Sequence, residues 1–298
     1  MLVVGVVGRK PMRSYFLLQL LAALELVLVV TSDFTPIWRD DFTSSTLDPS
    51  SWTVANNYTH GTKEWQLYLE EEVYIENGSM VIRTQHRDVA CGSKMYHFSS
   101  GWVDTSGKRE YGYGRYSASI KVPFELPGVW PAYWLVNDKK RCWPTGGEID
   151  IMEKVGGYRN DSNFGTYHWG QACGIDDWTK DGQRNGDFPH PPNQLFSNAF
   201  HNFTAYFNKT AITWEIDGHP YVSRISAQPA DLFIPSWPLF TIFNTALSYW
   251  EGPQPPPTTG FPVFMHVDWV EFAQWSGAGG TTGDFPIPMN TTGLHPGV

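Results

Sequence analysis

The chain has 298 residues, 41% of them hydrophobic and 15% aromatic, and its 21 basic and 30 acidic side chains give a net charge of −9. A net negative surface repels nucleic acids and sulfated polysaccharides, so these are excluded as expected partners and a neutral polymer is favoured. The length suits one large domain, and no composition break or internal repeat divides Trp38 to Trp275.

Residues 1–32 have the features of a secretory leader. A stretch with three basic residues precedes an apolar run at 15–30, which is shorter than the roughly twenty residues that cross a bilayer. We predict a signal peptide cleaved before Asp33 and a secreted protein that is extracellular or associated with a cell wall. The alternative is an uncleaved signal anchor, which would leave a membrane protein.

Strand signals dominate the rest of the chain, and no long helical period follows the leader. Asn77-Gly78 lies between two β-rich runs and is a strong hairpin signal. Apolar residues alternate from Arg115 to Val122, which predicts a strand with one buried face. The runs 204–207 and 212–216 predict a second hairpin, and Asp217-Gly218 predicts the next turn. Many short strands with Gly and Pro turns indicate an all-β sandwich.

The segment GGEIDIMEKVG places three acids in one β-type run. In a regular strand Glu148 and Asp150 share a face, whereas Glu153 points to the other. A β-bulge at Ile151 or Met152 would shift the register by one residue and return Glu153 to the first face. Grouped carboxylates raise one another's pKa and are rare on a purely structural strand. We therefore predict a catalytic site, with a solvated acidic strand or a metal site as the alternative.

Two carboxylates that flank one bond are the arrangement used in glycoside hydrolysis. A retaining enzyme holds its nucleophile and acid/base about 5–5.5 Å apart, whereas a gap of about 6.5–9.5 Å signals inversion. A straight strand would separate positions 148 and 153 by about 16 Å. The bulge and the local twist must contract this distance, or both side chains must lean inward. Positions five apart with a bulge suit the shorter gap and a retaining reaction.

Longer segments around the acids resemble glycoside hydrolase family 16, in particular its laminarinase-like endo-β-1,3-glucanase branch. The resemblance rests on ExDxxE with the upstream WPAYWL, and on residues 99–123, 201–218, 243–247 and 267–272. It implies a β-jelly-roll sandwich of two curved antiparallel sheets with a concave substrate cleft. Together with the leader and the composition of the C-terminal residues, it predicts a signal peptide at 1–32, a catalytic sandwich at 33–275 and a Gly/Thr/Pro-rich flexible tail at 276–298.

The resemblance also implies roles for individual residues. Glu148 is expected to be the nucleophile, Glu153 the acid/base, and Asp150 a neighbour that hydrogen-bonds Glu148. Four further positions match substrate-binding residues, with the histidine expected near the acid/base: Trp130, Trp134, His168 and Trp250. For Trp130 and Trp134 the alternative is simple packing within the sandwich, because aromatic rings serve both purposes.

The activity implied is a secreted, retaining endo-β-glucanase that cuts β-1,3-glucan or mixed β-1,3-1,4-glucan by double displacement. One alternative is a transglycosylase acting on cell-wall polysaccharide. The xyloglucan-remodelling branch of the family lacks the bulge residue that Ile151-Met152 retain here. A second alternative is a non-catalytic β-glucan recognition protein, although such relatives have lost the catalytic glutamates.

No cofactor is expected. The resemblance allows a structural calcium ion on the convex face, where Asp268 and the Gly78 carbonyl match its positions, but no residue is assigned as a metal ligand. The three cysteines permit one disulfide, and Cys142 and Cys173, which flank the acidic strand and the segment after it, are the favoured pair over Cys91. The protein is expected to be a monomer.

Six sequons predict N-linked glycans on a eukaryotic secreted protein. They begin at Asn57, Asn77, Asn160, Asn202, Asn208 and Asn290.

Overall fold

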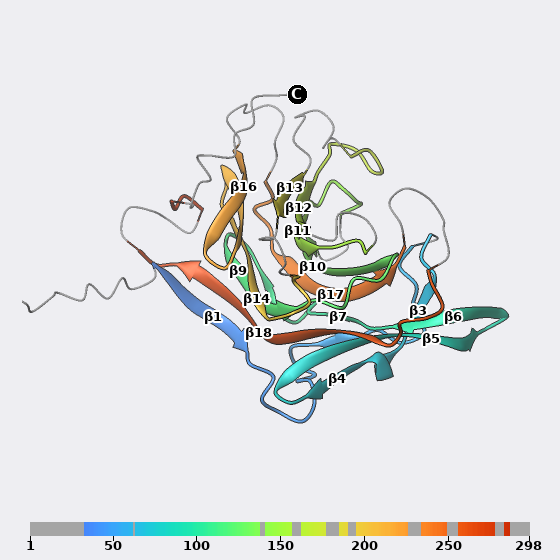
Figure 1. Cartoon of the computed structure of the whole chain (residues 1–298). Helices are drawn as coiled ribbons and strands as arrows, with labels where there is room; N and C mark the ends of the chain where they lie inside the picture. The colour runs from blue at the N-terminus through green and yellow to red at the C-terminus, as the bar shows by residue number, and fades with distance from the viewer. Residues whose placement is uncertain are drawn as a thin grey trace, which may run out of the picture. The chain divides into compact units, whose positions relative to one another are not determined.

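Two β-sheets, each antiparallel almost throughout, pack into a jelly-roll sandwich in the computed structural model (Figure 1). The structure describes residues 33–61, 63–137, 141–156, 162–176, 185–189, 195–225, 234–248, 256–277 and 283–286, with backbone alone for 185–189, 224 and 225. Within these ranges the helical element is the short 3₁₀ helix η1 (Glu70–Glu72), so the predicted all-β class is confirmed. No helix in the described part of the chain has the length and apolarity needed to span a bilayer.

The first sheet contains ten strands. Their order in space is β16 (His219–Ile225), β15 (Ala211–Ile216), β14 (His201–Phe207), β9 (Gly114–Lys121), β18 (Val263–Trp275), β5 (Ser79–Cys91), β6 (Lys94–Ser100) and β3 (Gln66–Tyr68), with β1 (Phe34–Asp40) beside β18 and β4 (Val73–Glu76) beside β5. The β3–β6 pair is parallel, and the other pairs in this sheet are antiparallel.

The second sheet contains eight strands and carries the predicted acids. Their order is β13 (Asn185–Pro189), β12 (Ser162–His168), β11 (Glu148–Glu153), β10 (Val129–Asn137), β17 (Leu239–Leu247), β7 (Trp102–Asp104) and β2 (Thr53–Val54), with β8 (Glu110–Tyr111) beside β17. All of these pairs are antiparallel, so the acidic strand β11 lies between β10 and β12.

The predicted hairpins are confirmed. Asn77 and Gly78 join β4 to β5 with φ values of 51° and 76°, and Asp217 and Gly218 join β15 to β16 with φ values of 50° and 80°. Positive φ at both central residues is what a two-residue hairpin turn with the twist of its strands requires. The runs predicted at 204–207 and 212–216 lie within the paired strands β14 and β15.

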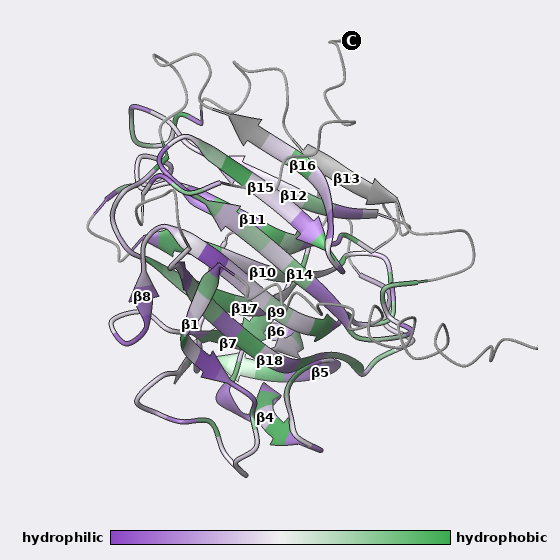
Figure 2. Cartoon of the chain, turned by 90° about the vertical axis from the view of Figure 1, so that its left-hand side faces the viewer, coloured by the Kyte–Doolittle hydropathy of each residue, from purple (hydrophilic) through white to green (hydrophobic). Residues whose placement is uncertain are grey.

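The core lies between the inner faces of the two sheets. Tyr116 from β9 and Tyr133 from β10 both belong to it, and the Tyr133 ring stacks on Phe243 of β17 at 4.6 Å. Green and purple segments alternate along strands of both sheets in Figure 2, because neighbouring residues point to opposite faces. The prediction of a single buried face for β9 is wrong, since Ser117 and Ser119 are buried too. Their small side chains lie on a central strand, and Ser117 hydrogen-bonds the neighbouring strand β14.

The C-terminal segment differs from the predicted flexible tail. Phe285 is buried and packs against Trp275 at 5.7 Å and Phe34 at 5.3 Å. Its carbonyl accepts a 2.8 Å hydrogen bond from Asn208 Nδ2. Burial of one aromatic side chain therefore fixes residues 283–286, in spite of the Gly- and Thr-rich composition around them. The rest of the tail beyond residue 277 and the predicted leader at 1–32 lie outside the described residues.

Candidate active site

A β-bulge in β11 places the three acids on the outer face of the second sheet. Tyr133 of β10 lies opposite Met152 and Trp134 lies opposite Asp150, so Ile151 has no partner on β10. The pairing of β11 with β12 slips over the same interval. Ile151 and Met152 are both buried in the core, which leaves the next residue facing outward. The predicted bulge is confirmed.

Glu148, Asp150 and Glu153 line one cavity of about 150 Å³. A larger cavity of about 660 Å³ begins at Glu148 and extends over β17 and β7, away from Glu153. Residues that line both cavities show that they form one continuous cleft: His60, Trp102, Trp134 and Glu148. A cleft with carboxylates at one end and indole rings along its wall suits a polymer of neutral sugars.

The two predicted tryptophans of β10 both lie in this cleft. Trp130 Nε1 donates a 2.9 Å hydrogen bond to Glu153 Oε1. Trp134 lines both cavities, and its Nε1 donates to Asn244 Oδ1 at 2.8 Å. Because Trp130 contacts one of the acids directly, its place in the site is fixed by hydrogen bonding as well as by packing.

His168 lies beside Glu148 and Asp150. The antiparallel register of β11 and β12 pairs it with Glu148, and its Nε2 is 4.0 Å from Glu148 Oε1 and 3.4 Å from Asp150 Oδ2. Its Nδ1 lies 2.6 Å from Asp176 Oδ2. The strand register thus sets this histidine opposite Glu148, and its charge also lowers the pKa of Glu153, the acid/base near which it was expected.

Asp150 was expected to hydrogen-bond Glu148, and the structure differs here as well. The nearest charged partner of the Asp150 carboxylate is His168, and Asp150 Oδ2 is buried without a hydrogen bond among the described residues. At 3.4 Å the His168–Asp150 contact is an ion pair without hydrogen-bond alignment. The effect of Asp150 on Glu148 is therefore electrostatic.

Burial and neighbouring charges shift the pKa values of the cluster. Burial raises the pKa of Glu148 and Glu153, the Asp150 carboxylate raises both further, and His168 opposes these shifts. Burial lowers the pKa of His168, but the Asp150 and Asp176 carboxylates outweigh it and raise that pKa to about 12. Glu153, whose pKa lies well above its ordinary value, is thus kept protonated, as a proton donor must be. The net effect raises the pKa of Glu148 to about 8, and the imidazolium beside it is the charged group that favours the ionised form that a nucleophile needs.

The same three side chains could be considered as a metal site. Glu148, Asp150 and His168 each offer one atom, and these atoms lie within 4.8 Å of one another. His168 pairs with Glu148, Asp150 and Asp176, so the structure shows an ion-paired cluster, and we assign no metal ligand here.

Several cleft residues had not been predicted. They are His60, Trp102, Trp143 and Asn244. The Trp102 ring meets Trp134 edge to face at 5.5 Å, and its Nε1 donates to Asp104 Oδ2 at 3.0 Å. The sequence could have indicated that Trp102 and Asp104 of β7 line the same surface, because residues two apart in a strand share a face. Of the predicted residues, Trp250 lies outside the part of the chain that the structure describes.

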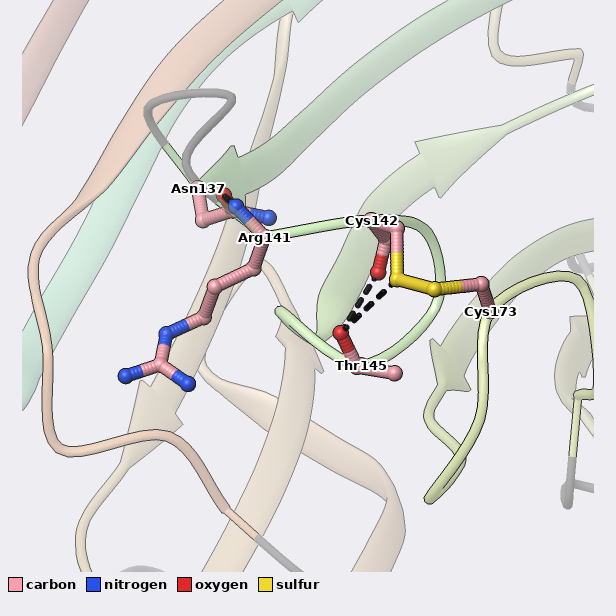
Figure 3. The surroundings of a disulfide bond; sticks show 5 residues. All are labelled: Asn137, Arg141, Cys142, Thr145 and Cys173. Carbon is pink, nitrogen blue, oxygen red and sulfur yellow. Dashed lines mark hydrogen bonds between the residues drawn. A yellow bond between two sulfur atoms is a disulfide. The ribbon is translucent and has the colours of Figure 1, made fainter.

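A disulfide joins the segments that border the acids. Cys142, in the connection that leads into β11, is bonded to Cys173, after β12, as the favoured pairing predicted (Figure 3). Thr145 Oγ1 donates to the Cys142 carbonyl at 2.7 Å, and Arg141 N donates to Asn137 Oδ1 at 3.3 Å. Cys91 is the free cysteine.

Comparison with known proteins matches residues 50–271 to the family model of the glycosyl hydrolases family 16. The chain is 28% identical to a glucan endo-1,3-beta-glucosidase A1 from Niallia circulans, over 78% of the chain but 37% of that protein. It is 27% identical to a beta-glucanase from Rhodothermus marinus, over 88% of the chain and 94% of that protein. Among solved structures it resembles the laminarinase catalytic domain from Thermotoga maritima MSB8, with a TM-score of 0.72 and 29% identity over 81% of the chain and 98% of that domain.

Proposed function

Because the chain belongs to the glycosyl hydrolases of family 16, we propose that it is a retaining endo-β-glucanase that hydrolyses β-1,3-glucan or mixed β-1,3-1,4-glucan. The observation that carries the proposal is the bulged strand β11, which turns Glu148, Asp150 and Glu153 into one cavity beside Trp130. The relatives named as a glucan endo-1,3-beta-glucosidase, a beta-glucanase and a laminarinase support the choice of substrate.

The reaction proceeds by two displacements. Glu148 attacks the anomeric carbon while Glu153 gives its proton to the glycosidic oxygen, so the C–O bond breaks and a covalent glycosyl-enzyme forms. Glu153, now ionised, then removes a proton from water as the water attacks the same carbon and releases Glu148. The Trp130 hydrogen bond stabilises Glu153 after it has lost its proton.

The test is an assay of reducing ends released from laminarin, barley-type mixed glucan, xyloglucan and agarose. Release from laminarin or mixed glucan, with the first product in the β configuration by NMR, is the expected result. Inverted products would overturn the proposed mechanism. A labelled glucan acceptor included in the same reaction separates hydrolysis from transfer, since products longer than the substrate would favour the transglycosylase. Binding of laminarin with no turnover would favour the recognition protein.

We also propose that the protein is a secreted monomer with N-linked glycans. The basic and apolar leader, a disulfide, and exposed sequons at Asn57, Asn77 and Asn202 support export to an oxidising compartment. Amino-terminal sequencing of protein from the medium should begin at Asp33. Recovery in membranes with residues 1–32 attached would favour the signal anchor, and light scattering would test the monomer.

A structural calcium ion remains to be tested on the convex face. Asp268 is exposed where the pairing of β18 with β9 slips, and Gly78 lies in the turn between β4 and β5. We make no metal assignment from these two positions. A thermal melt with EDTA and then with added calcium is the measurement, and a rise in the melting temperature that Asp268→Ala removes would establish the site.

A further inference from the structure

His168 faces acidic groups at both of its ring nitrogens. Nδ1 is 2.6 Å from Asp176 Oδ2, and Nε2 points to Asp150 and Glu148 at 3.4 and 4.0 Å. The other Asp176 oxygen, Oδ1, accepts a 3.3 Å hydrogen bond from Trp169 N. Asp176 thus holds the ring from the side away from the reacting groups and is itself held by the backbone.

The side chains around His168 are largely buried, so their charges are costly unless they are paired. The side chains of His168, Asp176 and Asp150 are 24%, 10% and 5% exposed. A buried carboxylate without a nearby cation is costly, and Asp150 Oδ2 has no hydrogen bond among the described residues. If the imidazole turned away, Asp150 and Glu148 would face each other without the positive charge that separates them.

The segment that presents Asp176 is tied down close to the acids. Cys173, three residues earlier, is bonded to Cys142 in the connection that leads into β11. Gly174 N donates to the Trp143 carbonyl at 2.8 Å, which adds a second link between the same two segments. The disulfide and this hydrogen bond together fix where the Asp176 carboxylate can reach.

We infer that Asp176 is a positioning residue for the proposed hydrolysis: it holds the His168 imidazolium beside Asp150 and Glu148. The Cys142–Cys173 disulfide in turn holds the segment that presents Asp176. The inference rests on the proposed function, because it assigns Asp176 a role that acts through the proposed nucleophile, Glu148. Nothing in the sequence pattern of the acidic strand points to Asp176, which lies 26 positions after Asp150.

The charged groups that face His168 determine in which direction the pKa of Glu148 should change when Asp176 is replaced. They are Glu148 and Asp150 from β11, with Glu153 further along, and Asp176 from the following segment, while the Trp143 ring at 5.8 Å is uncharged. Without Asp176 the imidazole loses its proton at lower pH and is no longer held beside Glu148. The Asp176 carboxylate itself raises the pKa of Glu148, but by less than His168 lowers it, so the pKa of Glu148 rises in the variant only if the ring moves away.

Asp176→Asn tests the inference by a pH profile. The acidic limb of kcat/KM on the best glucan should move to higher pH by about one unit, because an opposite charge at this distance shifts a pKa by that order. Asp88→Asn is a matched control, since Asp88 Oδ1 also lies 2.6 Å from a histidine Nδ1, that of His97, on the exposed β5–β6 hairpin. Asp88→Asn should leave both the acidic and the alkaline limb of the kcat/KM profile at the pH of the wild type. An acidic limb that is unshifted or moves to lower pH would show that His168 keeps its place without Asp176, and would overturn the inference.

Histidine-selective NMR gives a readout that does not depend on activity. The His168 ring should remain protonated to higher pH in the wild type than in Asp176→Asn, and Asp176→Glu should restore part of the difference. If Asp176→Asn does not fold, the double variant Cys142→Ser/Cys173→Ser replaces it and should shift the same resonance in the same direction. Equal His168 titration in the wild type and in the folded variants would overturn the inference. A protein without activity on any glucan would instead overturn the proposed function.

Discussion

The indole Nε1 of Trp130 donates a hydrogen bond of 2.9 Å to the Oε1 atom of Glu153. The bond joins neighbouring strands of the second sheet and can form only because the bulge turns Glu153 outward. It favours the ionised carboxylate and so lowers the pKa of Glu153 against the stronger effect of burial. The bulge in β11 thus brings the proposed acid, Glu153, within hydrogen-bond distance of Trp130 on β10, which lowers its pKa.

Trp130→Phe should weaken catalysis and move its pH dependence. Loss of a hydrogen bond to a charged group costs about 1.5–3 kcal/mol, so kcat/KM should fall by about 10- to 100-fold. The alkaline limb, which reports loss of the Glu153 proton, should shift to higher pH because the pKa of Glu153 rises. Trp269→Phe, on the first sheet beneath the Arg39 guanidinium, is the control for indole loss. An unchanged alkaline limb in Trp130→Phe would contradict the role given to this hydrogen bond.

Glu148→Gln should nearly abolish turnover and leave binding largely intact. The amide keeps the shape of the side chain but cannot form the glycosyl-enzyme, so kcat on laminarin should fall about a thousandfold or more. Binding can be followed by calorimetry with laminarin oligosaccharides. Glu76→Gln, on the exposed end of β4, is the matched control and should retain full activity. Full activity in Glu148→Gln would end the assignment of the nucleophile.

Trp214→Phe should destabilise the protein through the acidic strand. Trp214 of β15 is fully buried, and its Nε1 donates a 2.7 Å hydrogen bond to the Asp150 carbonyl, at the start of the bulge. Phenylalanine would leave that carbonyl unpaired in the interior, at a cost of about 1–3 kcal/mol. Urea denaturation should show the loss as a lower midpoint. A variant as stable as the wild type would mean that the bulge does not depend on this link between the sheets.

Asn208 should carry no glycan, although it begins a sequon. Its side chain is 3% exposed, Nδ2 donates to the Phe285 carbonyl, and Oδ1 accepts from Thr210 and Ala211. A glycan on Nδ2 would have to displace the packed segment 283–286. Peptide mass spectrometry after enzymatic deglycosylation in heavy-oxygen water should label the exposed sequons and leave Asn208 unlabelled. Labelling at Asn208 in folded protein would contradict the packing described for Phe285.

The acidic strand could be predicted from sequence because its information is local. The strand period of two and the spacing of Glu148, Asp150 and Glu153 require one extra residue, and the structure contains it at Ile151. Hairpins at Asn77-Gly78 and Asp217-Gly218 were predictable for the same reason, since positive φ is favourable for few residue types.

Contacts between distant segments were decided by the tertiary structure alone. The neighbour of His168 depends on the register of β11 with β12, and the contact with Asp176 depends on how the chain returns after β12. The cleft walls formed by His60 and Trp102 and the buried environment of Asn208 have the same origin. Sequence periodicity fixes which face of a strand a side chain occupies. What stands next to that face is set by sheet pairing across tens or hundreds of residues, where small changes in register change every neighbour.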